Sequence, residues 1–136
     1  IDTSINLNVP AYIENDYLPQ AELRLEMYKR LAECKTLDEL EILKDEIVDR
    51  FGPFSKTFQN LIELTKLKII SMPLMIKRII GTNKRIECTF DSESPILTDN
   101  KTNNVLVFNP QEDNSILFLQ NTFSTIISNL KLDEAS

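Results

Sequence analysis

The chain has 136 residues, of which 42% are apolar and 26% charged, and its formal net charge is −6. This length and composition fit one globular domain, residues 1–136, and no apolar run is long enough to span a bilayer. Because the chain begins at Ile1 without methionine or a signal peptide, we expect it to be a domain of a larger protein.

Residues 1–19 are expected to form a strand and a linker. Apolar Ile5, Leu7 and Val9 alternate with asparagines ahead of a proline, which is typical of a short strand at a sheet edge. The acidic linker that follows ends at Pro19. Four apolar side chains should pin it to the body of the domain: Tyr12, Ile13, Tyr17 and Leu18.

Residues 20–72 are expected to hold three helices, and the first begins after Pro19, which suits a first helical turn. Its apolar stripe is Ala21, Leu25, Tyr28, Leu31 and Ala32. Arg24 lies early in this helix, where a cation is unfavourable to the helix dipole. Its plainest interpretation is a surface charge paired with an acid such as Glu22 or Asp16.

The stretch from Leu37 to Phe54 contains the most clearly framed helix. Thr36 with Glu39 three residues later indicates a capping box, and Gly52 followed by proline is a typical helix stop. One apolar face recurs at helical spacing: Leu40, Leu43, Ile47 and Phe51.

A third helix should begin near Ser55 and end at Pro73. Its predicted inner face is Phe58, Leu61, Ile62, Thr65 and Ile69. Phe51 and Phe54 flank the turn between the second and third helices, so we expect them to plug that junction as core residues. The three helices are expected to pack on one face of a sheet.

Residues 74–120 are predicted to form strands. Ile76 to Ile80 and Ile86 to Phe90 make a hairpin around a glycine-containing turn, and Ser92 to Asn104 is an irregular loop. Two further strands are predicted at Val105–Phe108 and Ile116–Leu119. A last helix, 121–132, is indicated by Phe123, Ile126, Ile127 and Leu130. The predicted fold class is therefore α+β: a three-helix N-terminal cluster on a small, mainly antiparallel sheet, with a C-terminal helix.

Several kinds of site lack the residues that they need. The chain has no histidine and only two glycines, which argues against His-based acid–base catalysis and against a glycine-rich phosphate loop. Cys34 and Cys88 are isolated in different predicted elements, so we expect two reduced thiols in a cytoplasmic protein, not a zinc site. An enzyme active site within this chain is therefore not expected.

The outer side of the second helix carries the candidate binding residues. Glu46, Asp49 and Arg50 share one side of its last turn, and Ile42 lies among the charges one turn earlier. One interpretation is a solvated helix face with a single tolerated isoleucine, in which Arg50 pairs with Glu46. The other is a docking patch for a protein surface.

An ordered set of residues resembles the C-terminal domain of bacterial transcription-repair coupling factors, from about residue 5 to residue 90. The most specific part is the pentapeptide Asp49-Arg50-Phe51-Gly52-Pro53. Matching anchors precede it at ordered offsets: Tyr12-Ile13, Asp16-Tyr17, Arg24-Leu25 and Tyr28-Lys29-Arg30-Leu31. Beyond Phe90 the resemblance fades, and no residue is carried across there.

The resemblance implies a regulatory role. In that family an ATP-driven translocase pushes stalled RNA polymerase along DNA, and the excision-repair protein UvrA is recruited. The C-terminal domain is not the motor, so ATP, Mg and the DNA contact are expected in the parent motor and no cofactor in this domain. The domain is expected to dock on the UvrB-like N-terminal module of the same protein, hiding the UvrA-binding surface and restraining the translocase.

The family's Glu-x-x-Asp-Arg contact pattern matches Glu46, Asp49 and Arg50, and Ile42 would supply an apolar centre. The resemblance also suggests that Arg24 locks the linker to the first helix. Two alternatives remain. A nucleic-acid-binding domain would use the basic segment 66–85, because residues 56–90 carry a net charge of +5 while residues 1–55 and 91–136 carry −6 and −5. A purely structural cap on a motor would use neither surface.

Overall fold

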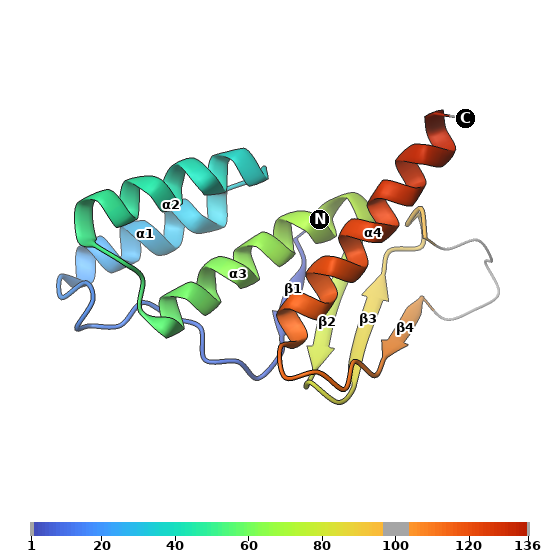
Figure 1. The fold of residues 1–136 in the computed structure, drawn as a ribbon, viewed down its shortest axis with the longest axis horizontal. Helices are drawn as coiled ribbons and strands as arrows, with labels where there is room; N and C mark the ends of the chain where they lie inside the picture. The colour runs from blue at the N-terminus through green and yellow to red at the C-terminus, as the bar shows by residue number, and fades with distance from the viewer. Residues whose placement is uncertain (1, 97–103, 136) are drawn as a thin grey trace. The chain divides into compact units, whose positions relative to one another are not determined.

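The computed structural model describes residues 2–96 and 104–135, with side chains up to Lys131. The chain divides into two compact units, one made of Ile1–Asn8 and Ile70–Ser136 and the other of Val9–Ile69. We call them the sheet unit and the helical unit (Figure 1). In the described part of the chain, no helix is long and apolar enough to cross a membrane.

The sheet unit is built on four strands in the order β1-β2-β3-β4. The strands are β1 (Ser4–Asn6), β2 (Ile76–Gly81), β3 (Ile86–Phe90) and β4 (Val105–Phe108). β1 runs parallel to β2, and the other pairs are antiparallel. The hairpin and the mainly antiparallel sheet are therefore confirmed. The predicted edge strand is present but shorter than expected, because β1 ends at Asn6, before Leu7 and Val9. The predicted loop between β3 and β4 lies largely outside the described residues, because 97–103 are not described.

Helix α4 (Ser115–Ala135) corrects the prediction for the end of the chain. The predicted strand Ile116–Leu119 is wrong, and the helix begins well before residue 121. Asn114 explains the difference, because its side-chain oxygen accepts the Leu117 N–H at 3.0 Å and caps the helix. A short apolar run fits a strand and a buried helical turn equally well, and here the cap decides.

The core of the sheet unit lies where α4 covers the sheet (Figure 1). The ring of Phe108 on β4 lies 6.0 Å from the ring of Phe118 and 6.4 Å from that of Phe123. Cys88 on β3 is fully buried, and this burial raises the pKa of its thiol to about 12. The Cys88 thiol is free, as is that of Cys34 in the helical unit.

The helical unit contains α1 (Ala21–Glu33), α2 (Leu37–Phe51) and α3 (Lys56–Ser71) up to Ile69. All three helices were predicted, with a short 3₁₀ turn, η1 (Met72–Leu74), around the predicted stop at Pro73. Helices and a mainly antiparallel sheet confirm the α+β class. That residues 1–136 form one domain, and that the helices pack on the sheet, stay predictions.

The predicted inner face of α1 is partly wrong. Met27 and Leu31 are its buried residues, whereas the side chain of Leu25 is 71% exposed. Tyr28 is also partly exposed, at 36%, and its hydroxyl oxygen faces the linker, where it accepts the backbone N–H of Ile13 at 2.8 Å. Apolar spacing predicted the helix but could not decide which overlapping stripe faces inward.

Candidate functional site

Helix α2 presents the candidate binding residues, and its frame is the one that the sequence predicts. The Thr36 hydroxyl oxygen accepts the Glu39 N–H at 3.1 Å. The Glu39 carboxylate in turn accepts the backbone N–H of Lys35 at 2.9 Å, one residue earlier than in the usual capping box. Leu40, Leu43 and Ile47 are buried. These three buried residues define the inner face of α2, so the residues on its other faces point toward solvent.

The C-terminal end of α2 is held by the linker. Gly52 has φ +92°, which favours glycine, and its N–H is donated to the carbonyl of Val48 at 2.8 Å. The Tyr17 hydroxyl donates to the carbonyl oxygen of Gly52 at 2.6 Å. This contact ties the linker to the glycine that ends the helix, next to the candidate residues.

Arg24 locks the linker to α1, as the resemblance suggests. Its Nη1 atom donates to the carbonyl oxygens of Leu18 and Pro19, both at 2.8 Å. The predicted pairing with Glu22 or Asp16 is not the contact that this side chain makes. Leu18 itself is buried, so the linker is anchored by its side chain and by its backbone.

The two phenylalanines at the end of α2 differ in role. Phe54 plugs the junction as predicted, with its ring centroid 4.8 Å from that of Phe58 and 6.4 Å from that of Tyr17. Phe51 is only half-buried, so the prediction that it is a core residue is partly wrong. The guanidinium carbon of Arg50 lies 4.8 Å from the centre of the Phe51 ring, a cation–π geometry. Phe51 therefore supports a candidate binding residue.

Ile42, Glu46, Asp49 and Arg50 form what we call the α2 patch. The Ile42 side chain is 69% exposed, and Asp49 and Arg50 are also exposed. Glu46 and Arg50 lie together, with 3.6 Å between Oε2 and Nη1. The structure therefore brings Glu46 and Arg50 into an ion pair and leaves Ile42 and Asp49 open to solvent on the same helix.

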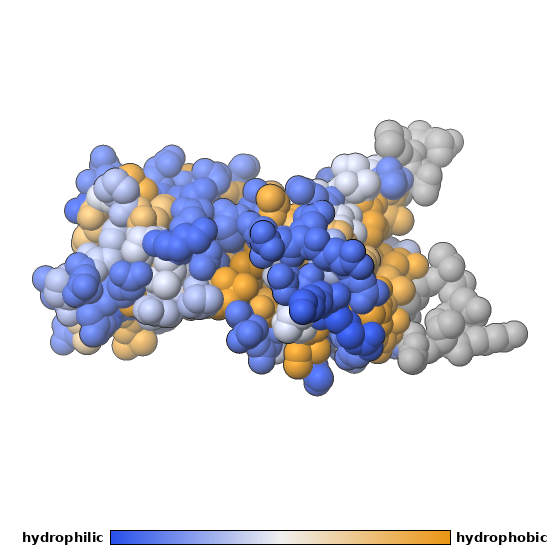
Figure 2. All heavy atoms as spheres, turned by 60° about the horizontal axis from the view of Figure 1, so that its bottom comes forward, coloured by the Kyte–Doolittle hydropathy of each residue, from blue (hydrophilic) through white to orange (hydrophobic). Residues whose placement is uncertain are grey.

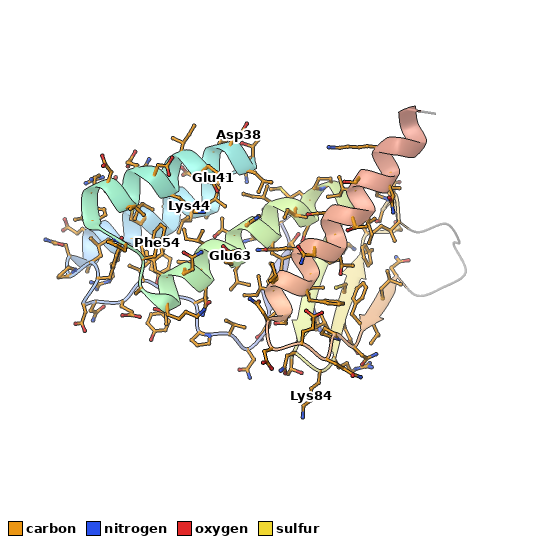
Figure 3. All side chains as sticks on the ribbon, viewed as in Figure 1. Asp38, Glu41, Lys44, Phe54, Glu63 and Lys84 are labelled. Atoms are coloured by element: carbon orange, nitrogen blue, oxygen red, sulfur yellow. The ribbon has the colours of Figure 1, made fainter. Side chains whose placement is uncertain are left out.

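Charged residues dominate the rest of α2. Asp38, Glu41 and Lys44 lie along it (Figure 3), and Lys44 pairs with Glu41 at 3.1 Å. On the face shown in Figure 2, the helical unit is mostly hydrophilic, with its apolar atoms in small separate areas. Ile42 follows Glu41 and lies one turn after Asp38, so it is an exposed apolar side chain with charged neighbours on α2.

Arg30 on α1 is a member of the site that sequence reasoning missed. Its Nη1 and Nη2 atoms donate to the two carboxylate oxygens of Glu46, and the Nη2–Oε1 distance is 3.0 Å. The hydrogen bonds from Arg30 lower the pKa of Glu46 and, from the other side, raise the pKa of Arg30. A basic residue late in α1 was visible in the sequence, but only the pairing of α1 with α2 identifies its partner.

The basic segment 66–85 is divided between the two units. Lys66 and Lys68 belong to the helical unit, and the rest of the segment's basic residues to the sheet unit. Within the sheet unit, Lys77 lies 3.9 Å from Asp91, and Arg85 pairs with the neighbouring Glu87 at 2.7 Å. These acids reduce the local positive potential that nucleic acid would meet.

Other features of the described residues give no catalytic or ligand site. In the described part of the chain, no three His, Cys, Asp or Glu side chains are placed to hold a metal ion. A cavity of about 480 Å³ at one end of the sheet unit has only exposed residues in its wall, so a ligand there would stay solvated. Its lining is Asn83, Lys84, Asn109, Gln111, Glu112 and Asp113.

Comparison with known proteins places these features in a family. The sequence model of the TRCF domain matches residues 7–101. The transcription-repair-coupling factor of Haemophilus influenzae is 41% identical over 75 residues, 55% of this chain and 6% of that protein. That of Escherichia coli is 34% identical over 82 residues, 60% of this chain and 7% of that protein. The chain therefore spans less than a tenth of the length of these curated relatives.

A solved structure has the same fold. The crystal structure of the C-terminal domain of a transcription-repair coupling factor superposes with a TM-score of 0.80 at 20% sequence identity. The match covers 99% of this chain and 96% of that one. The family model reaches residue 101, beyond the predicted end of the resemblance at Phe90, and the structural match extends further than either.

Proposed function

Because the chain belongs to the TRCF domain family, we propose that it is a non-catalytic regulatory domain that docks on the UvrB-like N-terminal module of its parent protein. Docking hides the surface that binds UvrA and restrains the DNA translocase until the parent protein engages stalled RNA polymerase. The α2 patch makes the contact.

One observation carries this proposal: Ile42 is 69% exposed beside the charged residues that the family pattern selects. Single exposed apolar residues are common, so exposure alone decides nothing. Here the exposed isoleucine lies on the same helix as Asp49 and Arg50, about two turns away from both. An apolar centre beside charges is the usual composition of a protein interface.

The patch suits a contact that must reopen. Exposed charge pairs contribute about 0–1 kcal/mol each, whereas they orient partners and speed their encounter. Arg50 has a planar guanidinium that can bind a carboxylate through two hydrogen bonds. A large apolar interface would hold the domain too tightly for release.

The absence of catalysis in this domain is part of the proposal. Carboxylates on α2 such as Asp38, Glu41 and Asp49 are exposed, so none of them lies in the apolar pocket that acid catalysis by a carboxyl group needs. The two thiols lie in different units, and both have a raised pKa, with burial as the main cause. Neither is an activated nucleophile.

Calorimetric titration of this chain with the UvrB-like module of its parent protein tests the proposal. Wild type is compared with Asp49→Arg and Arg50→Glu, and Lys29→Gln on the exposed face of α1 is the control for a charge change. We expect weak wild-type binding that both reversals abolish and the control keeps, with unchanged circular dichroism. Wild-type binding that survives both reversals would move the interface elsewhere. Since a tether raises the effective concentration, absence of binding in trans is followed by the same variants in the full-length protein.

A further inference from the structure

Glu46 is the residue through which α1 joins the α2 patch. Arg30 and Glu46 form a two-point contact between two helices, with each terminal guanidinium nitrogen facing one carboxylate oxygen. A guanidinium is a planar fork that can make such a two-point contact with a carboxylate, which a lysine could not reproduce. Both side chains are about one-third exposed, at 34% and 38%, so the pair lies at the rim of the helix pair.

The same carboxylate also restrains Arg50. The Oε2 atom of Glu46, which faces Arg30, lies 3.6 Å from Nη1 of Arg50. The ring of Phe51 supports the Arg50 guanidinium at 4.8 Å. The Arg50 guanidinium therefore contacts both a carboxylate and an aromatic ring, while 47% of its side chain stays exposed.

Occupation of Glu46 leaves Asp49 as the available acid of the α2 patch. The Asp49 side chain is exposed and makes no hydrogen bond or ion pair within the described part of the chain. The three residues selected by the family pattern thus differ in state. Arg50 is exposed and contacts Glu46 and Phe51. The Asp49 side chain is exposed and unpaired, and the Glu46 carboxylate is paired with Arg30 of the same chain.

We propose that Arg30 is a positioning residue of the docking site: it binds the Glu46 carboxylate, which holds Arg50 in place for a carboxylate of the partner. Asp49 then meets a basic group of the partner. The inference rests on the docking proposed above. It means that a residue of α1 helps to shape the binding surface on α2.

The first test measures the bridge without a partner. The Glu46 carboxyl group is titrated by carbon NMR in wild type, Arg30→Gln and Lys29→Gln. We expect the pKa of Glu46 to lie below its ordinary value in wild type and in Lys29→Gln, and to rise toward it in Arg30→Gln. In the same samples, relaxation of the Arg50 Nε nucleus should report a more mobile guanidinium only in Arg30→Gln. An unchanged Arg50 in that variant would overturn the positioning role, whether or not docking occurs.

The second test separates positioning from direct contact. Binding to the UvrB-like module is measured for Arg30→Gln, Glu46→Gln and the double variant, with thermal unfolding as a check of the fold. We expect Arg30→Gln to weaken binding about three- to tenfold, and the double variant to bind no more weakly than Glu46→Gln. Additive losses would show that Arg30 touches the partner itself. Wild-type affinity in Arg30→Gln, with Arg50→Glu still inactive, would overturn this inference and leave the docking proposal intact.

Discussion

Arg30 and Glu46 stand sixteen residues apart in the sequence, and their paired contact joins α1 to α2 at the edge of the α2 patch. The pair has a consequence for stability as well as for binding. Because the hydrogen bonds from Arg30 lower the pKa of Glu46, the folded chain favours the ionised carboxylate more than the unfolded chain does.

The first prediction is that the stabilisation from this pair is lost in acid. A carboxyl group with a lowered folded-state pKa contributes stability above its unfolded pKa, near 4.5, and loses it as pH falls through the folded value. The difference in unfolding free energy between wild type and Arg30→Gln should therefore shrink between about pH 7 and about pH 3. Urea denaturation at several pH values measures it. A difference that stays constant over that range would contradict the assigned ion pair.

The second prediction concerns the start of α2. Thr36→Ala removes the side-chain oxygen that accepts the Glu39 N–H, and loss of such a cap costs about 1 kcal/mol. Thr36→Ser keeps the oxygen and is the matched control. The midpoint of urea unfolding should fall for the alanine variant and stay near wild type for the serine variant. Equal midpoints for the two variants would show that the cap does not stabilise the helix.

The two glycines give a third prediction. At Gly52 a Cβ would meet no atom within 4 Å, so Gly52→Ala adds only backbone strain, because φ +92° with ψ −177° is a conformation nearly restricted to glycine; this strain is about 1–3 kcal/mol. At Gly81 a Cβ would lie 2.1 Å from the backbone oxygen of Arg85, which cannot move without disturbing the hairpin. Gly81→Ala should therefore destabilise the chain more than Gly52→Ala does. Unfolding free energies in the reverse order would contradict this account of the two turns.

Local signals explain which parts of the fold could be predicted. The frame of α2 follows from Thr36, Glu39 and Gly52, whose chemistry acts within a few residues. The β2–β3 hairpin follows from alternating apolar residues around one glycine turn. Both depend on contacts close in sequence, and both were confirmed.

Other parts depended on contacts that no local pattern contains. The buried face of α1 passes through Met27 and not Leu25, because the packing of the helix selects among overlapping stripes. The start of α4 depends on the cap by Asn114. Asn114 follows several other polar residues in a loop, so the sequence alone does not show which of them caps the helix. Of the candidate site, the sequence predicted Ile42, Asp49 and Arg50 as exposed, but the link from Glu46 to Arg30 required the register of two helices.

The fourth prediction concerns masking, the central claim, and it requires the whole parent protein. UvrA binding is measured for the full-length protein as wild type, as the double variant Asp49→Arg with Arg50→Glu, and as the control Lys29→Gln. If the α2 patch closes the UvrA-binding surface, the double variant should bind UvrA more tightly than wild type without activation, while the control should match wild type. Equally weak UvrA binding by all three proteins, with the domain folded, would contradict the account and return Asp49 and Arg50 to ordinary surface charges.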